Sequence, residues 1–128
     1  MKIVALIARI LLGLIFLILG LNGFLQFIHA PLPTGMAGTF LGVLIHSHYI
    51  FFICGVQLIA GVLLLVNRFL PLALVLLGAV IANILAYHLT MQWMGIPLAI
   101  FVAILWTILA WRLRAYLAPL FVQKAVQK

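Results

Sequence analysis

The chain contains no aspartate and no glutamate among its 128 residues. Their absence excludes paired-carboxylate acid–base catalysis, a carboxylate-ligated metal centre and a proton wire of acidic side chains. Charged residues of any kind make up 5% of the chain, whereas a soluble domain averages about 25%. Because 70% of the residues are hydrophobic, the sequence predicts a protein whose solvent is lipid.

Cysteine is also scarce, since Cys54 is the single cysteine of the chain. The chain can therefore form neither a C-x-x-C motif nor an intramolecular disulfide. A self-contained membrane thiol oxidase needs paired cysteines, and this function is excluded. A lone thiol inside an apolar run is typically unreactive.

Four apolar runs are long enough to cross a bilayer as helices, because about 20 residues at ~1.5 Å each cover a ~30 Å hydrocarbon core. We place these spans at about residues 10–28, 49–66, 69–89 and 97–117. The first run exceeds the length of a signal-peptide core and no A-x-A site follows it, so we expect it to be retained. The prediction is a single all-α domain, a four-helix transmembrane bundle covering residues 1–128.

All basic residues fall on one side of this four-span arrangement. They are Lys2, Arg9, Arg68, Arg112, Arg114, Lys124 and Lys128. The connections 29–48 and 90–96 contain no lysine or arginine. The positive-inside rule then predicts that both termini are cytoplasmic. We expect the basic tail, residues 118–128, to lie on anionic inner-leaflet lipids, and we expect no nucleic-acid partner.

Two connections have features of their own. Residues 36–45 are apolar but would rise only about 15 Å as a helix, so they predict a short helix at the outer interface rather than a fifth span. The inner connection, residues 67–68, is so short that the second and third spans must form a tight antiparallel hairpin.

Three carboxamides occur at similar depth on three different spans: Asn22, Gln57 and Asn83. A carboxamide in lipid needs a partner, so we predict that all three face the bundle interior. They could act as interhelical hydrogen-bonding groups, worth roughly 0.6 kcal/mol each. Alternatively, they could form a polar pocket that holds a lipid headgroup or a quinone ring.

The histidines all lie toward the outer face in this arrangement: His29, His46, His48 and His88. Such a cluster could bind a metal or haem, pass protons to a quinol, or simply lie among headgroups. No His-x₃-His spacing favours a metal, and we assign no metal ligands. The cofactor stays open, with a quinone favoured over haem. The candidate binding residues are Asn22, Gln26, Gln57, Asn83 and His88.

Glycines are frequent within the spans: Gly13, Gly20, Gly23, Gly55, Gly61 and Gly78. Small residues let helices approach closely. This approach could serve packing within the bundle or docking to other membrane subunits, and the sequence does not separate the two.

Several stretches resemble the DoxX family of small bacterial membrane proteins. They are residues 8–16 (ARILLGLIF), 20–24 (GLNGF), 55–65 (GVQLIAGVLLL), 67–74 (NRFLPLAL) and 83–88 (NILAYH). The resemblance covers roughly residues 8–90 and implies a four-helix bundle in the bacterial inner membrane. Some relatives are linked to quinone-coupled sulfur oxidation or to redox-stress complexes. Relatives often carry an acidic residue in the second helix, where this chain has Gln57.

Two functional hypotheses follow. The first is a quinone- or lipid-binding redox accessory protein, with the candidate residues around a headgroup. The second is a non-catalytic structural subunit of a larger membrane complex. A transporter is disfavoured, because four helices without internal charge offer no site for a coupling ion.

Overall fold

A computed structural model describes residues 2–25 and 32–125. In these two segments the chain is helical and contains no strand. The elements are α1 (Lys2–Leu25), α2 (Gly35–His46), α3 (Tyr49–Val66), α4 (Leu70–Thr90), η1 (Trp93–Gly95), α5 (Ile96–Arg112), α6 (Arg114–Leu117) and η2 (Ala118–Phe121). Four helical segments of the described chain are long and apolar enough to cross a membrane: α1, α3, α4 and the continuous pair η1–α5. The predicted all-α bundle of four spans is confirmed.

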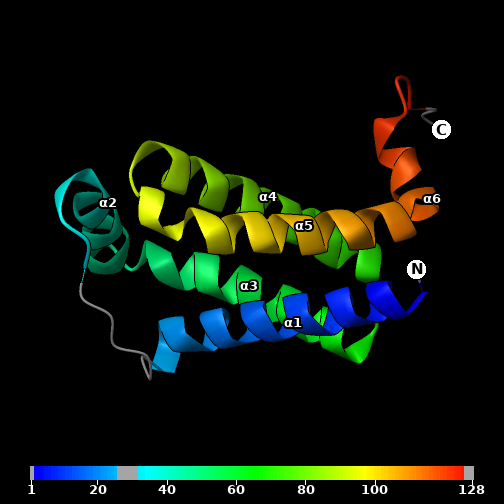
Figure 1. Cartoon of the computed structure of the whole chain (residues 1–128), viewed down its shortest axis with the longest axis horizontal. Coiled ribbons are helices and arrows are strands. Elements are labelled where there is room, and N and C mark those ends of the chain that lie inside the picture. Colours follow the sequence, from blue (N-terminus) through cyan, green and yellow to red (C-terminus); the bar gives the residue numbers. More distant parts are fainter. Residues whose placement is uncertain (1, 26–31, 126–128) are drawn as a thin grey trace.

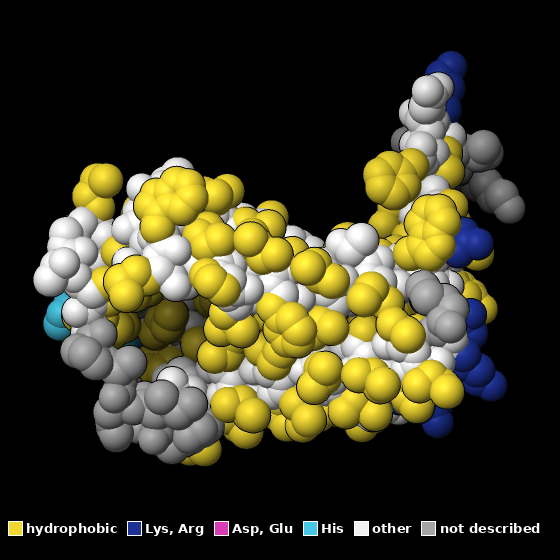
Figure 2. Space-filling model, viewed as in Figure 1, with side chains coloured by type: hydrophobic (Ala, Val, Ile, Leu, Met, Phe, Trp, Pro, Cys, Tyr) yellow, Lys and Arg dark blue, Asp and Glu magenta, His cyan; other side chains and the backbone are white. Residues whose placement is uncertain are grey.

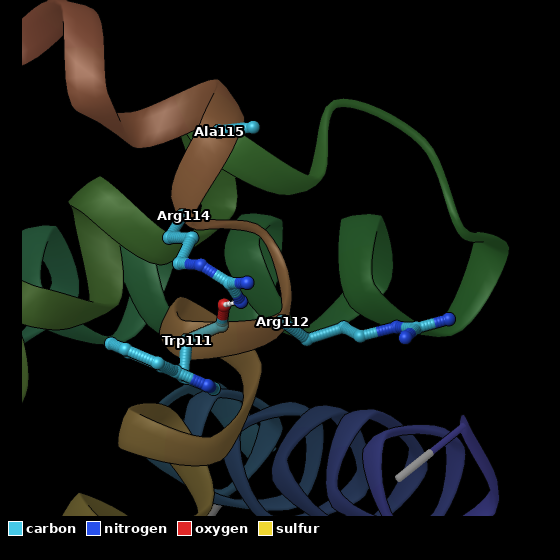
Figure 3. A pocket seen from close by; sticks show the side chains of 4 residues that line it. All are labelled: Trp111, Arg112, Arg114 and Ala115. Carbon is cyan, nitrogen blue, oxygen red and sulfur yellow. Dashed lines mark hydrogen bonds between the residues drawn. The ribbon is translucent and has the colours of Figure 1, made fainter.

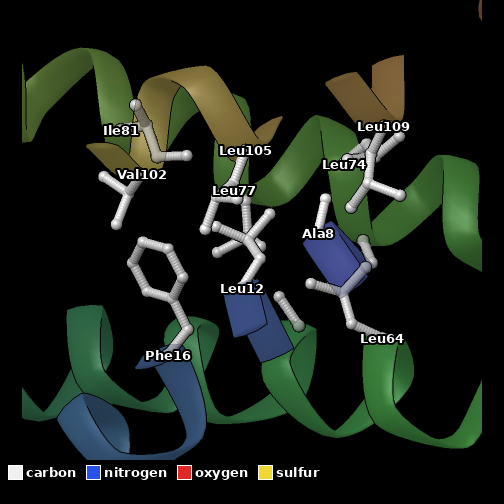
Figure 4. Packing of buried hydrophobic residues seen from close by; sticks show 12 residues of the cluster. Ala8, Leu12, Phe16, Leu64, Leu74, Leu77, Ile81, Val102, Leu105 and Leu109 are labelled. Carbon is white, nitrogen blue, oxygen red and sulfur yellow. The ribbon is translucent and has the colours of Figure 1, made fainter. Parts of the chain in front are cut away.

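The four long helices form a closed ring in which each packs against two neighbours (Figure 1). α1 contacts α3 and α5, and α4 contacts the same two helices from the other side. All neighbouring pairs run antiparallel. The centre of the ring is filled by large apolar side chains, among them Phe16, Leu12 and Leu77, which are fully buried (Figure 4). Along the axis of the described bundle these hydrocarbon side chains fill the space between the helices.

The closest contact between helices joins α1 to α3 through glycines. A Cβ atom added at Gly20 would lie 2.8 Å from the backbone N of Leu58, and one at Gly61 would lie 2.7 Å from the backbone N of Leu17. The two main chains therefore touch, as small-residue interfaces in membranes allow. Gly78 on α4 instead makes room for a tryptophan from α5. These glycines serve packing within the chain, which answers the question that the sequence left open for them.

The turn between α3 and α4 is as tight as predicted. Asn67 ends α3 in the left-handed conformation (φ 60°), and the backbone N–H of Arg68 donates to the carbonyl of Leu63 (3.1 Å). Asparagine tolerates this conformation better than most residues. Phe69 has a positive φ of 52° as well, which is costly for a bulky side chain.

The first span begins earlier than predicted, because Arg9 is part of the helix rather than its flank. α1 starts at Lys2, eight positions before the predicted start. Nη1 of Arg9 donates to the carbonyl of Leu64 and also to that of Leu65 (3.4 Å), at the end of α3. The Leu64 carbonyl also accepts from the backbone N–H of Asn67 (3.3 Å), and both carbonyls lie in the last turn of α3, at its negative end. The guanidinium is thus satisfied next to the bundle.

The fourth span ends at Arg112, and the predicted continuation to residue 117 is wrong. The chain turns at Leu113, and α6 points away from the bundle (Figure 1). Nη1 of Arg114 donates to the carbonyl of Trp111 (2.8 Å), and its guanidinium lies 4.5 Å from the centre of the Trp111 ring. The arginine thereby supplies a donor to a carbonyl of the last helical turn.

The short helix α2 confirms the predicted helix in the first connection and lies across one end of the bundle, packed on α3 (Figure 1). The opposite end carries the basic residues. α1 begins there with Lys2, the α3–α4 turn holds Arg68, and α5 ends there with Arg112. Figure 2 shows lysine and arginine side chains at this end and histidine at the other. The predicted segregation of charge along the bundle holds for the described chain.

Candidate functional site

A groove of about 580 Å³ lies between α2, α3 and α4. Its wall is largely apolar and is built from one side of α2, from residues 49–57 of α3 and from residues 75–87 of α4. Several of its residues are on the bundle surface; Phe52 is 66% exposed and Val75 is 45% exposed. The groove therefore opens sideways at the depth of the spans. The residues that line it are Phe40, Leu41, Leu44, Tyr49, Ile50, Phe52, Ile53, Val56, Gln57, Val75, Leu76, Ala79, Val80, Asn83, Ile84 and Tyr87.

Gln57 is the most informative residue of this wall. It lies midway along α3, and it is only 8% exposed, the one buried polar residue of the described chain. No hydrogen bond formed by the described residues involves its side chain. Among the described residues, every side-chain nitrogen or oxygen that is fully enclosed has a hydrogen-bond partner. The amide atoms of Gln57 have no such partner, so they are not fully enclosed. The carboxamide therefore keeps contact with the open space of the groove.

Such a group is costly to leave unsatisfied. Burial of an amide without a hydrogen bond costs roughly 1–3 kcal/mol, and hydrocarbon offers it no alternative partner. The amide has both donors and an acceptor. It can donate to a carbonyl group, and it can accept from a hydroxyl group.

Asn83 and Tyr87 continue the polar side of the groove toward α2. They are one helical turn apart on α4, or about 6 Å. Nδ2 of Asn83 donates to the carbonyl of Ala79 (2.9 Å), which leaves its oxygen available as an acceptor. The Asn83 side chain is exposed at the groove rather than directed into the bundle. The prediction of an inward-facing Asn83 is wrong, because its face of α4 borders the groove and not the ring centre.

α2 closes the outer end of the groove. The ring of Phe40 lies against that of Tyr87 with 5.7 Å between ring centres. Leu41 and Leu44 extend the same wall. The sequence interpretation placed α2 at the interface but missed this role. Ala37, Phe40, Leu41 and Leu44 are spaced at i, i+3, i+4 and i+7, which puts them on one face of the helix, and this spacing could have indicated the contact.

The other candidate residues lie elsewhere. Asn22 is half-buried on α1 and does not line the groove. Gln26 and His29 are outside the described residues. Nδ1 of His88 donates to the carbonyl of Ile84 (2.8 Å), and its ring packs on Gly95 of η1. Helical phase accounts for this arrangement, because Tyr87 is four residues from Asn83 and His88 is five, so Tyr87 and not His88 shares the face of Asn83.

The outer histidines within the described residues, which are His46, His48 and His88, do not converge. His48 begins α3 in a left-handed conformation and stacks on Phe51 with 5.7 Å between ring centres. His46 ends α2 and is exposed. The described residues contain no group of three metal-ligating side chains. Of the five candidates, the structure brings Gln57 and Asn83 together along one groove.

Comparison with models of known protein families gives no match, and neither curated proteins nor solved structures show a significant similarity to this chain.

Proposed function

We propose that this protein binds an isoprenoid quinone within the bilayer, with the quinone ring beside Gln57 and the tail along the apolar wall of the groove. The observation that carries the proposal is the buried, unpartnered carboxamide of Gln57 at the floor of a groove open to lipid. A quinone carbonyl accepts a hydrogen bond from the amide, and a quinol hydroxyl donates one to it. One neutral side chain can thus hold both oxidation states.

The wall chemistry supports the same ligand class. Small-molecule sites are mostly apolar with a few placed polar groups, and this groove has Gln57, Asn83 and Tyr87 in an aromatic and aliphatic surround. The binding role is that of a DoxX-like accessory protein of a bacterial inner membrane, with both termini cytoplasmic. The resemblance over residues 8–90 and the basic end of the bundle support this part of the proposal.

Three of the glycines in the spans do not support the alternative hypothesis of a purely structural subunit. Gly20, Gly61 and Gly78 are occupied by contacts within the chain and are not available for docking to neighbouring helices.

The test is extraction of the purified protein with organic solvent, followed by chromatography of the extract. We expect wild type to retain quinone and Gln57→Leu to retain at least fivefold less. The matched control is Gln92→Leu, which makes the same change at a half-buried glutamine outside the groove and should retain quinone as wild type does.

Stability gives an independent readout. If the Gln57 amide forms hydrogen bonds only with a ligand, Gln57→Leu removes an amide that is unpaired in the ligand-free protein. The ligand-free variant should then be at least as stable as ligand-free wild type. If Gln57 instead joins helices, the same change should destabilise it by roughly 0.6 kcal/mol or more. Extraction of phospholipid without quinone, or equal quinone from Gln57→Leu and wild type, would overturn the proposal.

A further inference from the structure

A second groove, of about 570 Å³, lies at the basic end of the bundle. It is distinct from the groove at Gln57 and involves α1, the α3–α4 turn and α5. Three basic residues line it: Lys2 and Arg9 from α1, and Arg112 from the end of α5. Its remaining wall is mostly apolar and consists of Ile3, Ala5, Leu6, Asn67, Leu70, Leu109 and Leu113.

The local sequence explains why these residues meet. Lys2, Leu6 and Arg9 are spaced i, i+4 and i+7, which puts them on one face of α1. On α5, Leu109 and Arg112 are three residues apart and share a face in the same way. Because α1 and α5 are antiparallel neighbours in the ring, the start of one faces the end of the other. The basic side chains and the leucines of the two helices therefore line the same groove.

The charges in this groove have no acidic side chain to neutralise them. The chain has seven lysines and arginines and no aspartate or glutamate. Arg9 is held by the carbonyls of α3, which satisfy its hydrogen bonds but carry no full charge. The side chains of Lys2 and Arg112 make no hydrogen bond to other described residues. Figure 3 shows Arg112 extending away from Trp111 and Arg114, which pair with each other.

We propose that this groove is a binding site for an anionic phospholipid. The phosphate lies between Lys2, Arg9 and Arg112, and an acyl chain runs along Leu6 and Leu109 toward the bilayer centre. The occupant is inferred from charge complementarity together with depth, since these three residues are at the end of the spans where headgroups lie. Lysine and arginine both bind phosphate, arginine through two parallel N–H groups. The apolar wall of the groove would be covered only by a ligand that also has a hydrocarbon chain.

The test is native mass spectrometry of the full chain in mild detergent, with phosphatidylglycerol or phosphatidylcholine of identical acyl chains added. We expect wild type to retain phosphatidylglycerol in preference to phosphatidylcholine. Arg112→Gln and Lys2→Gln change residues on separate helices, and each should lower this retention about fivefold. This is the change in affinity expected when one basic residue that contacts an anionic lipid is removed. Arg9 is left unchanged because it also holds the end of α3.

The matched control is Arg68→Gln, which removes a charge from the same end of the bundle but from a residue outside the groove. It should leave retention within twofold of wild type. If Arg68→Gln is as damaging as Arg112→Gln, the effect is general surface charge and the site is refuted. Equal retention of the two lipids also refutes it. Complete displacement of phosphatidylglycerol by excess inorganic phosphate would assign the groove to a free anion instead, and would overturn the proposal.

Discussion

The contact between α1 and α3 allows a quantitative test with two glycines of the same helix. A Cβ at Gly61 would lie 2.7 Å from the backbone N of Leu17 and 3.0 Å from the carbonyl O of Gly13. Both neighbours are backbone atoms, which cannot rotate away as a side chain can. A Cβ at Gly55 would meet nothing within 4 Å. Gly61→Ala should therefore force the helices apart, whereas Gly55→Ala should not.

The magnitude follows from two opposed terms. Overpacking costs typically about 1–3 kcal/mol, and glycine in a helix is about 0.8–1 kcal/mol less favourable than alanine. Gly55→Ala has only the second term and should gain up to about 1 kcal/mol. Gly61→Ala has both. The difference between the two variants cancels the helix term, and it should be about 1–3 kcal/mol in favour of Gly55→Ala.

The measurement is the free energy of unfolding in mixed micelles, obtained by titration with a denaturing detergent and followed by circular dichroism. Using two positions of α3 keeps the substitution, the helix and the solvent the same. If the two alanine variants agree within about 0.5 kcal/mol, the main chains of α1 and α3 are not in contact as described, and the close approach inferred for this interface is wrong.

Three further substitutions test separate features by the same titration. Phe69→Gly should raise the free energy of unfolding by about 1 kcal/mol, because φ is 52° there and left-handed backbone costs a non-glycine residue roughly 1–2 kcal/mol; a loss of stability would contradict this. Arg9→Gln should cost about 1.5–3 kcal/mol, since charge-assisted bonds to the end of α3 disappear; an unchanged value would show that water replaces them. Trp106→Phe should cost about 0.5–1.5 kcal/mol for the lost bond from Nε1 to the Leu74 carbonyl (2.8 Å), and a neutral result would count against that bond.

The sequence predicted the helices well because burial in lipid leaves a strong signal. An apolar run of about 20 residues has few other structures available, and α3 begins and ends at the predicted residues 49 and 66. The ends of the outer spans were predicted less well. The first span was predicted to begin after Arg9, and the fourth was predicted to continue past Arg114 to residue 117. In the structure, each guanidinium instead satisfies a carbonyl at a helix end, and hydropathy carries no information about such contacts.

The candidate site was predicted only in part, for a geometric reason. Helical phase alone places Asn83 with Tyr87, four residues on, and separates His88, which is five residues from Asn83. It does not give the rotation of each helix relative to its neighbours, and this rotation decides that Gln57 is buried while Asn83 borders a groove. The contribution of α2 depends on a fold-back of the chain, which brings Phe40 to Tyr87 across 47 positions of sequence.

Because the groove beside Gln57 opens sideways, the proposed ligand would reach it from the bilayer and not from the surrounding water. Occupancy then depends on the mole fraction of the ligand among the lipids, in two dimensions, and its aqueous solubility has no influence. Purification in detergent lowers this mole fraction, because empty micelles compete for the ligand, so the quinone retained by wild type and by Gln57→Leu is compared at the same ratio of detergent to protein. Affinities for this site are therefore meaningful when they are stated per lipid, and they are best measured in bilayers of known composition.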